Sequence, residues 1–268
     1  MEGKKAVLFF DVDLTLTDGA THEVPQSAQD AIHAAQKNGH LCFVNTGRPY
    51  SHVDPPVKAV GFDGYVCGCG IEIVLRGPDG ALRKIQDVKP SVEVQHRIRD
   101  LARELGQSCV FEGDGGIWYD GAIPLDEASM NEHMRLMRMG LYGSDNVYEP
   151  NFAYSKFLAD DVKTPEALAF LKEVDRYFDR IDRGGFFECV PKGYTKGTGL
   201  DTVMRLLGEN RVSYVFGDSP NDLEMFAHGD ISVAMGNAFD SVKAKADYVT
   251  DDLHADGVAN AIRHFGLA

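Results

Sequence analysis

The most constraining feature of the chain is a hydrophobic run, residues 6–10, that ends abruptly in two carboxylates, Asp11 and Asp13. A run of this length without polar alternation is typical of a strand buried in a parallel sheet. In open α/β sheets, ligands bind just beyond the carboxyl ends of such strands. Two acids placed there repel each other unless a cation lies between them. The segment indicates a metal site or, because aspartate is common in turns, a plain turn.

The first and last thirds of the chain alternate strands and helices. The expected helices are 27–38, 197–207, 222–227 and 257–265. The expected strands are 6–10, 41–45, 64–67, 213–216, 231–234 and 248–250. Apolar positions at helical spacing and the glycines after 38 and 207 support the helices. Such alternation predicts a parallel sheet.

The middle of the chain follows a different order. Helices are expected at 94–105, at 126–139 and from Pro165 to about Phe178, and short strands at 108–111, 116–119, 154–159 and 186–190. The methionines at 130, 134 and 137 are expected to pack in a core. We predict an α/β protein with a doubly wound parallel-sheet (Rossmann-like) core, residues 1–81 and 192–268, and an inserted α+β cap domain, residues 82–191.

Charge and composition restrict the partners. The formal net charge of −14 does not suit binding to nucleic acid or to an anionic membrane. No stretch approaches the roughly 20 apolar residues that a membrane span needs. The five cysteines are scattered, and Cys67-Gly68-Cys69 reads as a turn, so we expect no disulfide framework. A cytoplasmic location is expected, and no oligomeric state is predicted.

Other strand ends and helix starts carry reactive side chains. Thr46 and Asp218 each follow a strand, and Lys196 precedes a helix. In a parallel sheet these positions meet at one edge. Phosphoryl transfer needs an in-line nucleophile, a cation and donors around the phosphoryl oxygens. Carboxylates suit Mg²⁺, which makes Asp11 and Asp218 its natural ligands.

The same residue types supply the remaining chemistry. One aspartate can form an aspartyl-phosphate intermediate, and a second acid nearby can protonate the leaving oxygen and then activate water. Thr46 supplies a hydroxyl and Lys196 a fixed positive charge. The pattern therefore favours a phosphoryl-transfer enzyme.

These segments resemble, in order, the four motifs of the haloacid dehalogenase-like (HAD) phosphatases. The matching segments are Asp11-Val12-Asp13-Leu14-Thr15, Asn45-Thr46-Gly47-Arg48, Lys196-Gly197 and Gly217-Asp218-Ser219-Pro220-Asn221-Asp222. Residues 233–238 are similar to the stretch that usually follows the fourth motif. The insert between the second and third motifs resembles the α/β (type IIB) cap of the Cof-type subgroup. The resemblance spans the whole chain.

The resemblance implies a role for each matching residue. Asp11 would be the nucleophile and Asp13 the general acid/base. The implied metal site comprises Asp11, Asp13 (through its backbone carbonyl), Asp218 and Asp222. The implied phosphate-binding set comprises Thr46, Gly47, Arg48, Lys196 and Asn221. Asn221 and Asp222 would orient the metal's shell, Lys196 or the phosphate.

One residue departs from the family pattern. The family usually has glycine after the second aspartate, where this chain has Leu14. Glycine there eases a tight turn. Leucine must take an ordinary negative φ or tolerate strain. The substitution puts the rate in question, but not the reaction.

The resemblance implies an enzyme, a Mg²⁺-dependent phosphatase of small phosphorylated metabolites, with sugar phosphates the expected substrates. A cap over the strand ends would exclude water and select the leaving group. The alternatives are a sugar phosphomutase on the same scaffold and a non-catalytic phosphate-ligand-binding protein. The binding protein would predict a lost nucleophile or acid, and both Asp11 and Asp13 are present.

Overall fold

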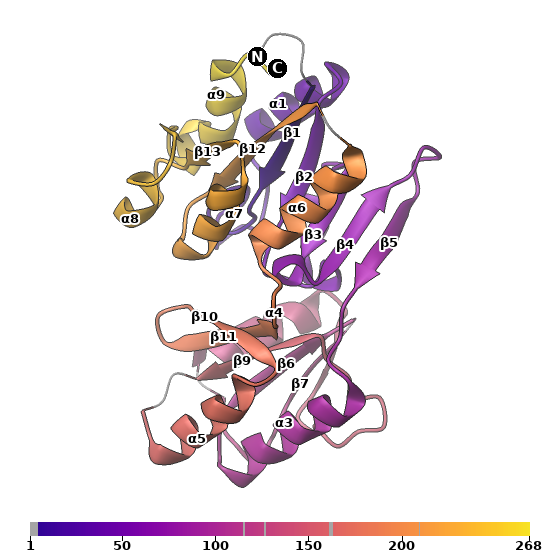
Figure 1. Ribbon diagram of the computed structural model, residues 1–268, viewed down its shortest axis with the longest axis vertical. Helices are drawn as coiled ribbons and strands as arrows, with labels where there is room; N and C mark the ends of the chain where they lie inside the picture. Colours follow the sequence, from indigo (N-terminus) through magenta and orange to yellow (C-terminus); the bar gives the residue numbers. More distant parts are fainter. Residues whose placement is uncertain (1–4, 115, 126, 161–162, 209) are drawn as a thin grey trace. The chain divides into compact units, whose positions relative to one another are not determined.

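The computed structural model describes residues 5–114, 116–125, 127–160, 163–208 and 210–268 (Figure 1). The chain divides into two compact units. The first comprises Met1–Gly47, Val53–Gln86 and Thr195–Ala268, and the second comprises Arg48–His52 and Asp87–Tyr194.

The first unit is built on an eight-stranded sheet in the order β14-β13-β12-β1-β2-β3-β4-β5. Its strands are β1 (Lys5–Phe10), β2 (Leu41–Asn45), β3 (Gly64–Cys67), β4 (Glu72–Arg76), β5 (Leu82–Asp87), β12 (Arg211–Gly217), β13 (Ile231–Ala234) and β14 (Tyr248–Val249). The strands from β14 to β3 pair in parallel, and β4 is antiparallel to β3. Residues 6–10 of β1 are buried, as expected for a central parallel strand.

Helices cover both faces of this sheet, which makes it doubly wound (Figure 1). The helices and 3₁₀ turns of the unit are α1 (Gln26–Lys37), α2 (Pro55–Ala59), η2 (Gly68–Gly70), α6 (Lys196–Leu207), η3 (Pro220–Asp222), α7 (Leu223–His228), α8 (Asp240–Lys243), η4 (Leu253–Ala255) and α9 (Gly257–His264). Helix α1 packs against α9, and α6 packs against α7. The α/β fold class predicted from the alternation is confirmed.

The second unit has a six-stranded sheet in the order β10-β11-β9-β6-β7-β8. Its elements are η1 (Tyr50–His52), α3 (Val92–Glu104), β6 (Cys109–Gly113), β7 (Gly116–Tyr119), α4 (Glu127–Arg138), β8 (Tyr142–Ser144), β9 (Lys156–Asp160), α5 (Pro165–Val174), β10 (Phe178–Asp182) and β11 (Phe186–Pro191). Successive residues of a strand point to opposite faces. Phe111 and Phe157 pack with α3 and α5, whereas Val110 and Leu158 pack around Leu136 of α4.

Unit boundaries differ from the expected ones because of a hairpin. The turn Gly77-Pro78-Asp79-Gly80 joins β4 to β5, and β5 extends the eight-stranded sheet. The second unit therefore begins at Asp87 rather than at residue 82, and it ends at Tyr194 rather than at 191. Residues 48–52 also group with the second unit.

Two expectations for the second unit were wrong. Met130, Met134 and Met137 are 37%, 45% and 41% exposed, because Leu136, not they, occupies the buried side of α4. The helix expected to reach Phe178 ends at Val174, and Phe178 begins strand β10. The expected start of α4 at Asp126 lies outside the described residues.

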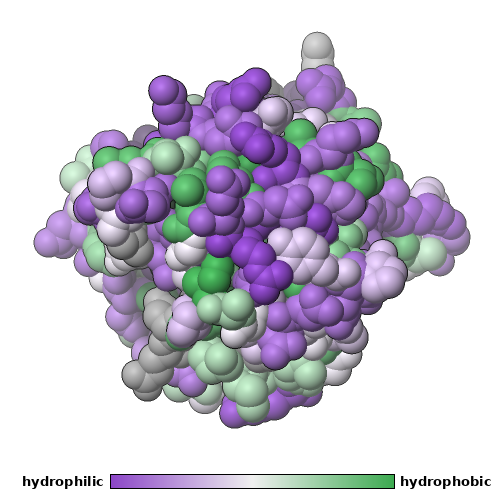
Figure 2. Space-filling model, turned by 90° about the horizontal axis from the view of Figure 1, so that it is seen from below, coloured by the Kyte–Doolittle hydropathy of each residue, from purple (hydrophilic) through white to green (hydrophobic). Residues whose placement is uncertain are grey.

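Hydrophilic residues cover most of the face in Figure 2, with hydrophobic residues in scattered patches. Within the described ranges, no helix combines the length and the apolar character that crossing a membrane requires. All five cysteines are buried and have free thiols, and η2 places the expected turn at Cys67-Gly68-Cys69.

A buried group of charges lies within the second unit. The Lys156 ammonium is 2.6 Å from Glu188 Oε1 and 2.9 Å from Glu112 Oε2. Arg183 donates from Nε to Glu188 Oε2 at 2.9 Å. Burial alone would raise the pKa of Glu188, but Lys156 and Arg183 outweigh burial and lower that pKa to about 2.

This pKa shift predicts acid lability. A carboxyl whose pKa falls from 4.5 in the unfolded chain to about 2 on folding stabilises the fold above pH 4.5. That contribution, on the order of 3 kcal/mol, is lost as the pH falls from about 4.5 to about 2. We expect Glu188→Gln to be less stable than the parent protein at pH 7, and the gap to shrink across this window.

Trp118 of β7 is the chain's one tryptophan, so its fluorescence reports on unfolding of the second unit. Urea unfolding followed by this signal at several pH values measures the gap. The matched control is Glu166→Gln, an exposed glutamate in the first turn of α5. A gap between Glu188→Gln and the parent that stays constant from pH 7 to pH 3 would contradict the prediction.

Candidate active site

Strand register brings the predicted site residues to one edge of the first sheet. Phe10 of β1 pairs with Phe216 of β12 on one side and with Val44 of β2 on the other. Asp11 therefore leaves the sheet beside Asp218, and its backbone N–H donates to the Phe216 carbonyl at 3.0 Å. The carboxyl ends of these strands form the edge at which ligands bind in open α/β sheets.

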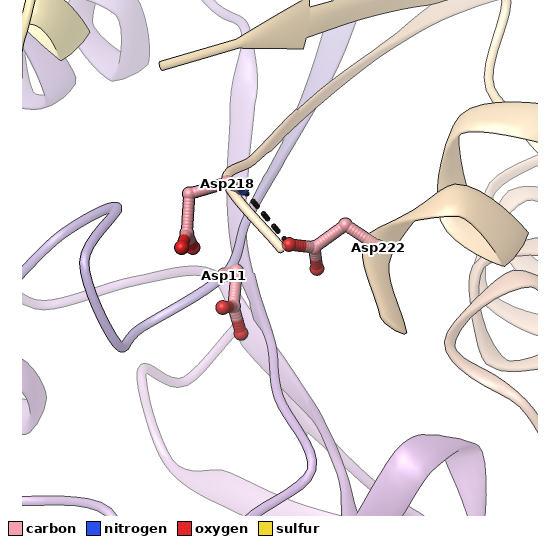
Figure 3. Close-up of side chains that lie close together, drawn as sticks. All are labelled: Asp11, Asp218 and Asp222. Carbon is pink, nitrogen blue, oxygen red and sulfur yellow. Dashed lines mark hydrogen bonds between the residues drawn. The ribbon is translucent and has the colours of Figure 1, made fainter. Parts of the chain in front are cut away.

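Three carboxylates converge at this edge. Asp11, Asp218 and Asp222 each offer an oxygen, and these oxygens all lie within 4.8 Å of one another. Figure 3 shows the carboxylates of Asp11 and Asp218 close together, with Asp222 reaching toward them from the other side. All three side chains are buried. Oxygen donors with this charge density fit a hard divalent cation.

Asp222 is held by the loop that precedes it. Its Oδ2 accepts the backbone N–H groups of Asp218 at 2.9 Å and Ser219 at 3.0 Å. A Cβ on Gly217 would lie 2.5 Å from the Asp222 carboxyl carbon, so only glycine admits this approach. Since Oδ1 of Asp222 also accepts from Lys196, both of its oxygens are engaged within the protein.

Lys196 supplies the positive charge of the site. Its ammonium donates to Asp11 Oδ1 at 2.6 Å and to Asp222 Oδ1 at 2.7 Å. Lys196 is the first residue of α6, whose N-cap Thr195 forms a capping box with Thr198. A Cβ on Gly199 would lie 2.4 Å from Val66 Cγ1, so glycine lets the helix approach β3 closely.

Burial sets the protonation of these groups. It raises the pKa of Asp11 to about 7, with Lys196 opposing the shift and the charges of Asp222 and Asp13 adding to it. It also raises the pKa of Asp218 to about 8, with the charges of Asp11 and Asp222 adding to the shift. Burial alone would lower the pKa of Lys196, but the two carboxylates outweigh it and raise that pKa. The site thus has more negative charge than one ammonium neutralises.

The other predicted site residues differ in burial and in the unit to which they belong. Thr46 is buried, and two hydrogen bonds fix its backbone. Its N–H donates to the Val66 carbonyl, and its carbonyl accepts from the Cys69 N–H at 3.1 Å. Asp13 is exposed. Asn221 accepts from the Ser219 hydroxyl. Gly47 is the last residue of its segment in the first unit, and Arg48 groups with the second unit.

Leu14 adopts a left-handed backbone with a φ of 60°. Of the two possibilities that the sequence left open, strain is therefore the one realised. Its N–H donates to Thr17 O at 2.8 Å, and its carbonyl accepts from Asn237 Nδ2 at 2.8 Å. The loop fixes this conformation, which costs a residue with a Cβ about 1 kcal/mol.

Three supporting residues have no role in the sequence-based prediction. The Thr15 hydroxyl donates to Asp218 Oδ1 at 3.2 Å. Asn45 Nδ2 donates to the Lys196 carbonyl at 2.9 Å. Asn237 ties the loop of Leu14 to Leu253 N, which donates to its Oδ1. All three lie inside or next to the quoted motifs, which was the available signal.

Comparisons with known proteins agree with this geometry. A sequence profile of the haloacid dehalogenase-like hydrolases matches residues 8–262. The putative phosphatase YkrA of Bacillus subtilis (strain 168) is 26% identical over 276 residues, covering 97% of this chain and 98% of that protein.

Two solved phosphatase structures share the fold. The HAD subclass IIB sugar phosphatase BT4131 has a TM-score of 0.78 and 27% identity, covering 98% of this chain and all of that one. BT1666, a HAD phosphatase from Bacteroides thetaiotaomicron, has a TM-score of 0.80 and 26% identity, covering 99% of this chain and 96% of that one.

A doubly wound core with acidic side chains at its strand ends, interrupted by a second α+β unit, is the architecture that this chain shares with phosphatases of the haloacid dehalogenase-like class. The chain belongs to the haloacid dehalogenase-like hydrolase family, since the profile spans nearly its whole length. The family predicted from the four motifs is confirmed, and the named relatives support a phosphatase.

Proposed function

We propose that this enzyme is a Mg²⁺-dependent phosphatase that hydrolyses small phosphate monoesters, with sugar phosphates as the favoured class. The observation that carries the proposal is the convergence of Asp11, Asp218, Asp222 and Lys196 at the carboxyl edge of the sheet. The description of BT4131 as a sugar phosphatase supports the substrate class.

The proposed reaction has two steps. A carboxylate oxygen of Asp11 attacks phosphorus in line, and the bond to the leaving oxygen breaks as Asp13 donates a proton to that oxygen. The product is an aspartyl-phosphate. Asp13 then removes a proton from a water molecule that attacks phosphorus, which releases phosphate and restores Asp11.

Other residues in this proposal position the reacting groups. Lys196 fixes the Asp11 carboxylate and offers positive charge to the phosphoryl oxygens, together with the Thr46 hydroxyl. Gly47, Arg48 and Asn221 complete the proposed phosphate-binding set. Asp222 acts as a positioning residue, because its oxygens already hold Lys196 and the backbone of the fourth motif.

Asp11 and Asp218 would hold the Mg²⁺ ion, with the Asp13 carbonyl as a further oxygen ligand. The fit rests on the excess negative charge: burial and the neighbouring carboxylates raise the pKa values of both acids, and a divalent cation favours their ionised forms. When bound, Mg²⁺ supplies neutralisation of phosphoryl charge.

Metal removal tests this proposal. We expect free phosphate to be released from a panel of single-phosphate sugars with Mg²⁺, and the rate to fall about 100-fold or more in chelator, because metal-derived charge stabilisation is worth several kcal/mol. Added Mg²⁺ should restore the rate. Asp30→Asn, an exposed acid on α1, is the control that keeps full activity.

Two outcomes would refute the assignment. Equal rates with Mg²⁺ and with chelator would exclude the proposed metal role. Conversion of one sugar phosphate into an isomer without free phosphate would instead identify a phosphomutase.

A further inference from the structure

The leucine side chain at position 14 neither favours the backbone conformation found there nor packs in the core. Its left-handed φ of 60° suits glycine or asparagine better than leucine. Its side chain is 46% exposed, whereas the flanking apolar residues Val12 and Leu16 are fully buried. The fold therefore requires the left-handed backbone at this position but does not require a leucine there.

Hydrogen bonds explain why the backbone cannot relax. Leu14 is held at both its N–H and its carbonyl, by Thr17 and by Asn237. Two further bonds, from Leu16 N and Thr17 N to the Val12 carbonyl at 2.9 Å each, close the loop beneath it. A strained, exposed apolar residue that persists in so constrained a loop points to a role outside folding.

The position of Leu14 locates that role. It follows Asp13 directly, and adjacent Cα atoms are about 3.8 Å apart. A general acid must come within hydrogen-bond reach of the leaving oxygen. The next residue, Thr15, donates to Asp218 at 3.2 Å, so the loop runs along the carboxylates. The exposed side chain of Leu14 is therefore one residue away from the proposed general acid, in a loop that contacts the carboxylate site.

We propose that Leu14 is a specificity-determining residue that contacts the carbon atoms next to the ester oxygen and selects leaving groups with C–H surface over charged ones. The inference rests on the proposed phosphatase activity and deepens it. Around a site rich in carboxylates, an apolar side chain favours alkyl or sugar carbons and disfavours a carboxylate-bearing leaving group, which would lose hydration against it.

The test compares two small substrates, propyl phosphate and 2-phosphoglycolate, which differ in the charge of the leaving group. We expect Leu14→Ala to lower the ratio of their kcat/KM values about 5-fold, since a partly enclosed leucine discriminates modestly between leaving groups. Leu14→Met, which keeps an apolar side chain of similar size, should keep the ratio within about 2-fold of the parent.

A third variant distinguishes the effect of backbone strain at position 14 from the effect of the proposed side-chain contact with the leaving group. Leu14→Asn tolerates the left-handed backbone, so it should melt about 2 °C above the parent and still lose the ratio as Leu14→Ala does. The matched control is Leu206→Ala, the same change at a 56% exposed leucine. Leu206 lies near the C-terminal end of α6, and Lys196 of the active site lies at the N-terminal end. Leu206→Ala should leave the ratio unchanged.

Two results would overturn the inference by itself. The ratio could stay the same in Leu14→Ala, whether both activities are kept or both fall equally, which would make Leu14 at most a support for the loop. The ratio could also follow the melting temperature and change in Leu14→Asn alone. A parent protein inert toward both substrates and toward the sugar-phosphate panel would refute the proposed function, and the inference with it.

Discussion

Replacing Asp11 with asparagine is expected to lower phosphate release by at least about 10³-fold, because the amide cannot form the aspartyl-phosphate. The change is nearly isosteric, and asparagine Oδ1 can still accept from Lys196, which donates to Asp11 at 2.6 Å. The loss should appear in kcat and in kcat/KM alike, measured with saturating Mg²⁺. Retention of full activity would remove Asp11 from the mechanism.

The same variant should not be less stable without metal. The pKa of Asp11 rises from 3.8 in the unfolded chain to about 7 on folding, so the folded state holds the proton more tightly. Ionised Asp11 therefore costs stability as the pH rises from about 4 to about 7. In chelator at pH 8, Asp11→Asn should melt no lower than the parent, and the control Asp30→Asn should match the parent in both rate and melting temperature.

Replacing Lys196 with methionine is expected to have the largest effect on stability. The ammonium is buried between Asp11 and Asp222, and its removal leaves those carboxylates facing each other without a counter-charge. Losing one partner of a buried ion pair costs about 3–5 kcal/mol. Urea unfolding at pH 7 in chelator, followed by circular dichroism, measures this loss, and phosphate release should fall with it.

A control variant and a pH series test whether the loss of stability in Lys196→Met has the proposed electrostatic cause. Lys37→Met, the same change at an exposed lysine in the last turn of α1, should shift stability by no more than about 0.5 kcal/mol. Lowering the pH should reduce the deficit of Lys196→Met, because protonation of the crowded carboxylates relieves their repulsion. An unfolding free energy equal to that of the parent at pH 7 would show that the ammonium does not compensate these charges.

Sequence periodicity predicted the parts of the fold that are locally determined. Strands β2, β3 and β13 have the predicted bounds, because each is a short, mainly apolar run that begins directly after a polar residue. The convergence of Asp11, Asp218 and Lys196 was also predictable. Parallel pairing fixes which strand ends share an edge, so residues 207 positions apart can be placed together from the chain alone.

Other features depend on tertiary context. The hairpin of β4 and β5 was missed although Pro78-Asp79-Gly80 is a turn signal, because its strands alternate weakly. The exposure of Met130, Met134 and Met137 depends on which side of α4 meets its sheet, which one sequence does not fix. The loop that holds Leu14 at its positive φ is tied down partly by Asn237, which donates to the Leu14 carbonyl from more than 200 residues away in the chain.

The pairing of β1 with β12 has a consequence for biosynthesis. Lys5 of β1 pairs with Arg211 of β12, and β1 separates β12 from β2 in the sheet. A ribosome makes β1 before β12, so one edge of this apolar strand is unpaired until about two hundred further residues have been translated. Lys196 and Asp218 also belong to the last third of the chain. A nascent chain truncated before β12 would therefore contain the proposed nucleophile and the entire second unit, but no active site.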